Sequence, residues 1–517
     1  MKHWLTRQLI FQKLNNPIGL GLLVGIAILL SYAIAFFELK IGIAILVMIM
    51  GIPIIGACLM NPNFALYILL SMGILVNCIK KSIDAPIGMA MDGLIFIAFF
   101  GIIIQQSKDR DFKFVKNPIS VLIIIWMGFN FLQVLNPSAT SRLAWIYTVR
   151  SMAGMIFIYF IALYAFSNIK NITLAIKAIL AAGFISALYG LKQEFFGFSN
   201  DELTWLYSDP ERLQLILQWS RLRIFSFFSD PTTFGIVMAY LGTFSFILCT
   251  GPFSTAKKSL LFFAGSCMFL AMAYAGSRTP FILVPFGFII FTLLTLKKEV
   301  ILTMGVLFLL GTAFMMKSTS SAVVYRIQSA FLPGKADDTM QVRYKNQKFI
   351  QPIIHRHPVG MGLGSTGVWA KRFTPDSLLA NFAHDSGFVR IAVEMGWIGL
   401  IIYMIFLFML AKTSIYYYLR VRNQKIKVFY LACTTIFFQL TLASYPQEVL
   451  VMLPTSIIFN ILAAAAVRMK DFDTYIIDIK PLPPTSMIIP LETDEVPSNV
   501  DGLPTPYNNW SRPKELK

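Results

Sequence analysis

Runs of about 20 consecutive apolar residues recur along this 517-residue chain. Such a run is long enough to cross the hydrocarbon core of a bilayer as one α-helix, whereas the strands of a membrane barrel are shorter and alternate in polarity. A backbone in lipid must satisfy its own hydrogen bonds, and a helix does so within each segment. The runs therefore predict an all-α fold, a polytopic transmembrane helix bundle of about 12–14 helices.

The composition agrees with a membrane protein. Hydrophobic residues make up 56% of the chain and charged residues only 14%, against about 25% charged in soluble proteins. The mean hydropathy is +0.68. We place fourteen membrane runs at residues 18–37, 41–59, 63–79, 88–106, 118–135, 147–167, 172–190, 232–250, 258–275, 279–296, 299–316, 386–411, 427–445 and 449–467.

The net charge of +18 lies mostly in short segments between these runs, so it does not indicate nucleic acid as a partner. We expect the basic N-terminus to be a cytoplasmic segment and not a removed signal peptide. With the N-terminus in the cytoplasm, the short cytoplasmic segments hold 19 Lys and Arg and the short outer segments hold 5. Cytoplasmic loops carry the excess of Lys and Arg. The bias predicts that both termini are cytoplasmic.

The runs divide the chain into three parts. Residues 1–190 are expected to form N-terminal transmembrane helices, 191–467 a membrane core, and the proline-rich residues 468–517 a disordered cytoplasmic tail. The core includes a large extracytoplasmic loop, 317–385, and a second outer segment, 191–231. Both are too small for cores of their own, so we expect them to lie on the bundle as a lid.

Basic residues at two turns are candidates for binding an anion. Arg221 and Arg223 come just before a membrane run, and Arg278 lies between two closely spaced runs, all on the predicted outer side. Arginine presents a planar set of donors that suits phosphate, and a helix N-terminus adds positive potential. The alternative for each is an arginine at the membrane interface, directed to lipid headgroups.

The stretch NFAHDSGFVRIAVEMGWIGL, residues 381–400, leads from the large loop into a membrane run. His384 can exchange a proton near neutral pH, although a packing role is the alternative. Asp385 or Ser386 is placed to cap the helix that follows. Arg390 and Glu394 are four residues apart, which favours a structural ion pair on one helix face.

Other features are weaker. The glycines of 360–366 predict a loop with close backbone approach rather than a nucleotide site. His355 and His357 have no obvious third metal ligand, and Asp84 and Asp92 flank a membrane run. The five cysteines lie in or beside apolar runs without metal-binding spacing, which favours packing. No cofactor or metal ion is expected.

Four short elements between residues 220 and 445 occur in a distinctive order. RIFSFFSDPT is followed by a Ser-Arg pair, an arginine ahead of a Gly-x-Gly loop, and a histidine ahead of a Glu-x-Gly-x-x-Gly-Leu run. The residues that carry them are Arg223, Phe228, Pro231, Ser277, Arg278, Arg343, Gly360, Gly362, Gly364, His384, Glu394, Gly396, Gly399 and Leu400.

In this order and spacing the chain resembles the O-antigen ligase and polysaccharide polymerase (Wzy-like) superfamily of membrane glycosyltransferases. The sequence departs from the family elements at three positions, since Ser226 stands for a glycine and Thr232 and Asp385 each stand for an asparagine. Asp385 is the neighbour of His384, so the orientation of His384 relative to that in the family stays open.

The resemblance implies a metal-independent glycosyltransferase of the GT-C type in the bacterial cytoplasmic (inner) membrane, active on the outer face. The donor would be a glycan linked to a polyprenyl diphosphate such as undecaprenyl diphosphate, and the acceptor a lipid or another glycan. Arg223 and Arg278 would hold the diphosphate and His384 would act as general base or bind phosphate, with Arg221, Arg343 and Asp385 as further substrate contacts.

The resemblance leaves ligation and polymerisation of a cell-envelope polysaccharide both open, and other polysaccharide-assembly proteins are expected partners besides membrane lipid. A transporter or flippase for lipid-linked glycans is the alternative. A transporter favours inverted repeats with polar residues at the midplane of the membrane, whereas here the notable charges gather on one predicted face.

Overall fold

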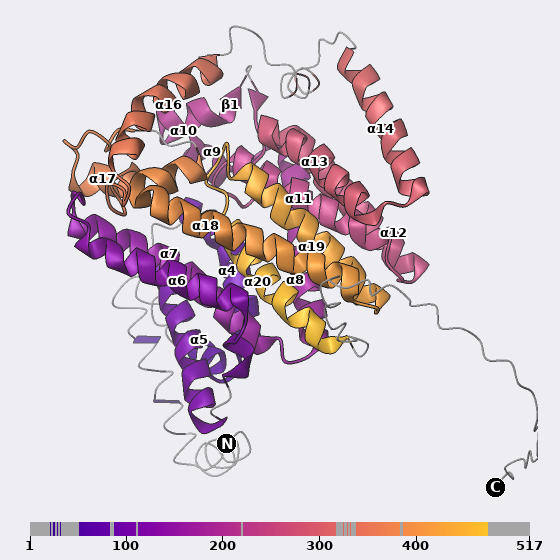
Figure 1. Cartoon of the computed structure of the whole chain (residues 1–517), viewed down its shortest axis with the longest axis horizontal. Helices are drawn as coiled ribbons and strands as arrows, with labels where there is room; N and C mark the ends of the chain where they lie inside the picture. The colour runs from indigo at the N-terminus through magenta and orange to yellow at the C-terminus, as the bar shows by residue number, and fades with distance from the viewer. Residues whose placement is uncertain are drawn as a thin grey trace, which may run out of the picture. The chain divides into compact units, whose positions relative to one another are not determined.

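The computed structural model describes residues 51–82, 87–109, 112–218, 221–316, 338–382 and 386–473, together with a few isolated positions. The chain divides into two units, residues 1–476 and 477–517, and the described residues all belong to the first. Regular structure in this part is almost entirely helical (Figure 1). Its strands β1 (Leu217–Gln218) and β2 (Arg221–Leu222) pair as a short antiparallel hairpin.

Ten of the described helices are long and apolar enough to cross a membrane. They are α4 (Pro62–Ser82), α5 (Ile87–Asp109), α6 (Pro118–Leu132), α7 (Arg142–Ala165), α8 (Ile169–Phe196), α11 (Pro231–Cys249), α12 (Thr255–Ala275), α13 (Arg278–Thr295), α18 (Gly387–Arg420) and α19 (Gln424–Ala443). They confirm the predicted all-α polytopic bundle.

The remaining expected runs have different outcomes. The run 299–316 forms α14 (Lys298–Met316). The run 18–37 and most of 41–59 lie outside the described residues, apart from a short helix, Gly51–Met60, that overlaps the end of the second.

The expected run 449–467 begins too early. Its helix, α20, is only Thr455–Arg468, and residues 444–454 form a series of turns. Pro446 and Pro454 interrupt this apolar stretch, because proline lacks the N–H that a continuing helix needs. We call residues 444–454 the α19–α20 turn.

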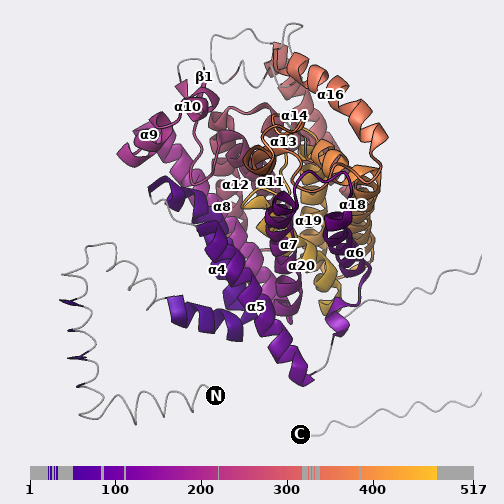
Figure 2. The same ribbon diagram turned by 90° about the vertical axis from the view of Figure 1, so that its left-hand side faces the viewer.

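The longer loops pack against one end of the bundle. The hairpin, α9 (Asn200–Tyr207), α10 (Pro210–Ile216) and α16 (Asp338–Arg356) lie at the same end in both views (Figures 1 and 2). α16 ends two residues before Pro358. Its Ile350 is buried against Val393 of α18, as expected for a loop without a core of its own. We call this the loop-bearing end.

Two of the ten candidate membrane-spanning helices are more deeply buried than the others. In the apolar stretch of α11, 83% of the residues are buried, and in that of α19, 78% are buried. In α6 and α13 the share is 28% each. α11 and α19 therefore face protein on nearly all sides, while α6 and α13 present much of their surface outward. The positions of the ends of α11 and α19 therefore determine which turns lie next to each other at the loop-bearing end.

A break in α18 lets a glycine loop pack against its backbone. Gly396 has φ +67°, so the helix is interrupted there. The Val393 carbonyl accepts a hydrogen bond from the Met361 N–H at 2.8 Å and the Glu394 carbonyl one from the Gly362 N–H at 3.0 Å. This is the close backbone approach that the glycines predicted.

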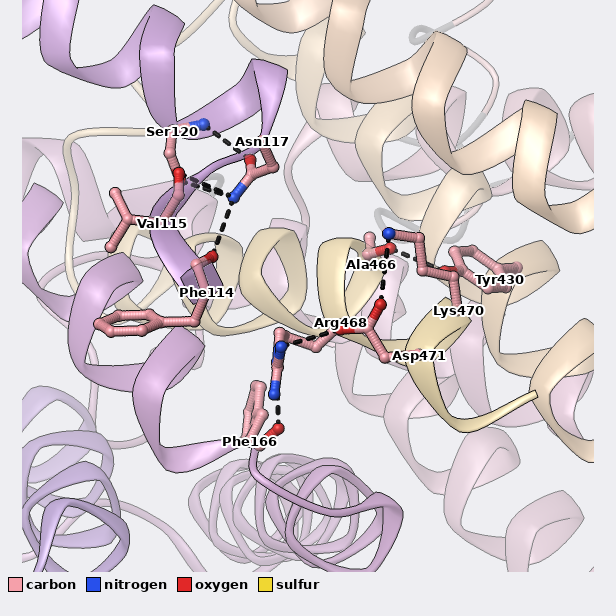
Figure 3. Close-up of polar contacts among 10 residues, drawn as sticks. All are labelled: Phe114, Val115, Asn117, Ser120, Phe166, Tyr430, Ala466, Arg468, Lys470 and Asp471. Carbon is pink, nitrogen blue, oxygen red and sulfur yellow. Dashed lines mark hydrogen bonds and ion pairs between the residues drawn. The ribbon is translucent and has the colours of Figure 1, made fainter. Parts of the chain in front are cut away.

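The opposite end is held by polar contacts around the last helical turn (Figure 3). The Arg468 guanidinium donates to the Phe166 carbonyl at 3.2 Å and pairs with Asp471 at 2.8 Å, and the Tyr430 hydroxyl donates to the Ala466 carbonyl at 2.8 Å. Helical structure continues through η4 (Met469–Phe472), so the first residues of the expected tail pack on the bundle. Residues 474–517 lie outside the described residues.

Replacing Gly396 by alanine is expected to destabilise the protein. The new Cβ would lie 2.0 Å from the Pro358 carbonyl oxygen, and φ is left-handed. The strain alone costs about 1–3 kcal/mol and the clash adds to it. Thermal unfolding of the detergent-purified protein should show a clear fall in Tm. Gly128→Ala is the matched control, because a Cβ there meets nothing within 4 Å. Equal Tm values for the two variants would contradict the close approach.

Candidate active site

Arg223 is buried and joins two distant segments. It follows β2 directly and is only 8% exposed. Its Nε donates to the Ala275 carbonyl at 2.9 Å, and its Nη2 donates to the Ser277 hydroxyl. The side chain therefore lies against the turn before α13 rather than at lipid headgroups, which was the alternative for this arginine.

Arg278 is the first residue of α13 and is half-buried. The preceding Ser277 does not cap the helix with its side chain, because its hydroxyl accepts from Arg223 and donates to the Thr232 hydroxyl at 3.0 Å. The first N–H groups of α13 keep their partial positive charge. Two arginines and a helix N-terminus thus meet at one turn of the loop-bearing end.

The neighbouring α11 begins differently. Asp230 caps it by accepting hydrogen bonds from the Thr232 N–H at 2.9 Å and the Thr233 N–H at 2.8 Å. This carboxylate satisfies the end of α11, so positive potential is concentrated at α13 instead. The Thr232 side chain, one residue into α11, then reaches Ser277.

The structure separates Arg221 from this arrangement. Its guanidinium forms an ion pair with Glu194 of α8, and its side chain is 53% exposed. It also lies over the Tyr274 ring, 5.8 Å from the centroid. The carboxylate offsets the charge of Arg221.

Three of the expected site groups are not described. His384 and Asp385 lie outside the described residues, and so does the side chain of Arg343, whose backbone is in α16. Their described neighbours fix where α18 starts. The Ser386 hydroxyl caps the helix by accepting from the Val389 N–H at 3.4 Å, and the Gly387 N–H donates to the Ser444 carbonyl at 3.0 Å.

Arg390 lies between two carboxylates near the start of α18. Its Nε is 3.4 Å from Glu394, the pair expected from the spacing, and its Nη1 is 2.6 Å from Glu448 in the α19–α20 turn. Glu394 is 1% exposed and also accepts a hydrogen bond from the Thr366 hydroxyl at 2.8 Å. This network joins α18 to the glycine loop and to the α19–α20 turn.

A cavity of about 100 Å³ adjoins this network. Its polar lining comes from Arg390, Ser444, Glu448 and Asn460. Apolar residues of α6, α7, α18 and α20, among them Trp126 and Phe406, form most of the rest. The start of α18, three residues after His384, therefore borders a space that is mainly apolar with one charged wall.

The other expected features have structural roles where they are described. Asp92 pairs with Arg150 at 3.2 Å, and Asp84 lies outside the described residues. The His355 ring lies tilted against the Trp397 ring, with 5.6 Å between the ring centroids. Within the described residues, no three His, Cys, Asp or Glu side chains gather in a way that would hold a metal ion.

Sequence reasoning missed the partners of the site residues. Glu448, Thr366 and the Ser277–Thr232 contact were not anticipated, because each joins segments that are far apart in the chain. One signal was present for Glu448, an acidic residue beside an apolar stretch, where a carboxylate needs a partner.

Arg390→Met is expected to lower the free energy of unfolding by about 3–5 kcal/mol, because Glu394 and Glu448 would lose their shared arginine in a buried site. A thermal or denaturant unfolding series on the purified protein measures this. Asp471→Asn is the control, since it removes a carboxylate from pairs whose Asp471 side chain is 34% exposed and should change stability by about 0–1 kcal/mol. Similar losses for both variants would argue against the buried pairing.

Comparison with known proteins supports the resemblance. The family model described as O-antigen ligase matches residues 263–404, which include Arg278, Arg343, His384 and Glu394 but not Arg223. No curated protein matches the chain. Residues 263–404 are therefore similar to the O-antigen ligase domain, and this match supports, in general terms, an O-antigen ligase-like membrane glycosyltransferase.

Proposed function

We propose that this protein transfers a glycan from a polyprenyl diphosphate to an acceptor hydroxyl at the loop-bearing end of the bundle. One observation carries the proposal. Arg223 and Ser277 hold the turn that begins α13, so the charge of Arg278 and the N-terminus of that helix are presented together. This combination suits a diphosphate, which carries several negative charges.

The proposed chemistry needs few protein groups. The acceptor oxygen attacks the anomeric carbon of the donor sugar while the bond from that carbon to the diphosphate oxygen breaks. Negative charge develops on the leaving diphosphate, where fixed cations lower the barrier most. The acceptor hydroxyl loses its proton, and we assign its removal to His384. This scheme uses no metal ion.

The two arginines have different roles in the proposal. Arg278, half-buried at the helix start, is the one assigned to contact the diphosphate. Arg223 uses three of its nitrogens on Leu215, Ala275 and Ser277, so it adds positive charge and holds the turn in place. Arg221, already paired with Glu194, is assigned a minor contribution to substrate binding.

The loop charges support an extracytoplasmic active site. The inner short segments predicted from the sequence hold 19 Lys and Arg against 5 in the outer ones. Lys81 of the outer set contacts Ser226 next to the hairpin, at the loop-bearing end. We therefore assign this end to the outer face of the cytoplasmic membrane. Ligation and polymerisation both fit, because they share the donor and differ in the acceptor.

A transfer assay in membranes or detergent tests the assignment. With an undecaprenyl diphosphate-linked glycan as donor, Arg278→Ala should reduce transfer about 10²–10³-fold, as for loss of a group that stabilises developing charge. His384→Ala should reduce it about 10²–10⁴-fold, as for loss of a general base. Rates are normalised to the amount of protein in the membrane.

Arg420→Ala is the matched control, a half-buried arginine at the end of α18 that lies over Tyr416 at 4.1 Å. Its transfer rate should stay near wild type. Full transfer by both the Arg278 and His384 variants would refute the proposed site. Movement of the intact lipid-linked glycan across the bilayer, without transfer, would instead identify a flippase.

A further inference from the structure

A buried bend between β2 and α11 contains a residue in an unfavourable backbone conformation. Ser226 has φ +52°, in the left-handed region that favours glycine, and is 1% exposed. For a residue with a side chain this conformation costs about 1–2 kcal/mol. Some interaction must therefore hold Ser226 in place, three residues from Arg223.

Each polar group of Ser226 is bonded to a transmembrane helix. Its N–H donates to the Gln193 side-chain oxygen at 2.7 Å, and its hydroxyl donates to the Ser186 carbonyl at 2.7 Å, both on α8. Its carbonyl accepts from the Lys81 amine at 3.3 Å, near the end of α4. The bend is therefore fixed from two helices.

Gln193 is the centre of this arrangement. Its oxygen also accepts from the Phe225 N–H at 3.1 Å, and its nitrogen donates to Glu202 at 2.7 Å. The two ends of the amide are distinguished by these partners, because the oxygen faces two donors and the nitrogen faces a carboxylate. Gln193 is 2% exposed and Glu202 6% exposed, so water does not compete for either.

Glu202 is in turn held in one orientation. One oxygen accepts from the Tyr189 hydroxyl at 3.1 Å, and the other accepts from the Ser199 N–H at 2.9 Å as part of a capping box at the start of α9. The start of α9 therefore orients Glu202, Glu202 orients the Gln193 amide, and Gln193 holds the backbone of residues 225 and 226.

We propose that Gln193 is a positioning residue for the active site, which sets the bend at Ser226 and thereby the place of Arg223 against residues 275–277. Only two residues separate Arg223 from Ser226, and Phe225 between them is fully buried. A change of backbone direction at Ser226 therefore moves Arg223. The inference rests on the proposed function, and Gln193, Ser226 and Arg223 lie outside the matched segment 263–404.

Suppression by glycine tests this inference. Gln193→Met fills a similar volume but offers no comparable acceptor, and it should reduce glycan transfer about tenfold, the factor expected from losing about 1.4 kcal/mol of hydrogen bonding. In that background Ser226→Gly should restore most of the transfer, because glycine adopts positive φ without cost. Ser226→Ala should not restore it, although it loses the same hydroxyl.

The double variants Gln193→Met/Ser226→Gly and Gln193→Met/Ser226→Ala form the decisive pair. Both lack the Ser226 hydroxyl, but only the alanine variant has a Cβ that disfavours positive φ at residue 226. They can be compared even when the single Gln193 variant is not recovered in membranes. Gln105→Met is the matched control, because it makes the same replacement at a glutamine whose amide donates to the Leu59 and Met60 carbonyls instead. Its transfer rate should remain near wild type.

Higher transfer by the glycine double variant than by the alanine one supports the inference. Equal transfer by the two double variants overturns the inference, and so does wild-type transfer by Gln193→Met. In either case the proposed function still stands if Arg278→Ala remains inactive. Full transfer by Arg278→Ala and His384→Ala would overturn the proposed function itself, and the role of Gln193 with it.

Discussion

The pairing of Arg390 with two carboxylates is the contact on which the loop-bearing end most depends. Arg390 and Glu394 are on α18, and Glu448 comes from the α19–α20 turn. Charges inside an apolar bundle are costly unless they are paired with good geometry. Since Glu394 is almost fully buried, the pair forms only when α18, the glycine loop and the turn are all in place.

The glycine loop contributes to the same constraint. The interruption at Gly396 releases carbonyls of α18, and the N–H groups of Met361 and Gly362 satisfy two of them. Unsatisfied backbone groups in a membrane are unfavourable by several kcal/mol each. The glycine loop thus supplies hydrogen bonds that the interrupted helix lacks. Because the two backbones must approach closely to form them, glycines occur on both sides of the contact.

The apolar helices position the proposed site, but the chemistry lies in turns between them. Ser277 precedes α13, Thr232 belongs to the first turn of α11, and Arg223 follows a two-residue strand. Such positions are near the ends of helices, where polar groups reach each other or water at little cost. This is a reason for Arg223 and Arg278 to meet at one end rather than at the midplane of the bundle.

The sequence predicted features that depend on local pattern and missed those that depend on distant partners. Run length and hydropathy sufficed for the all-α bundle, and a spacing of four residues sufficed for the Arg390–Glu394 pair. Hydropathy misplaced the start of α20, because it does not register the effect of Pro446 and Pro454 on a helix.

Arg221 and Arg223 show the limit most clearly. They are two residues apart in the sequence, yet Arg221 pairs with Glu194 and Arg223 is buried against residues 275–277. Their difference comes from tertiary contacts, and no local pattern separates them.

Ser226 shows how one departure from a family element can be linked to the rest of a structure. A glycine at this position would adopt the bend without help, whereas serine needs bonds from Gln193, Ser186 and Lys81. Those bonds connect α8 and α4 to the segment that carries Arg223. The serine therefore makes the place of this arginine depend on helices that contribute no group to the proposed chemistry. If the proposed function holds, substitutions in α8 are expected to alter glycan transfer from a distance, through the backbone at residues 225 and 226.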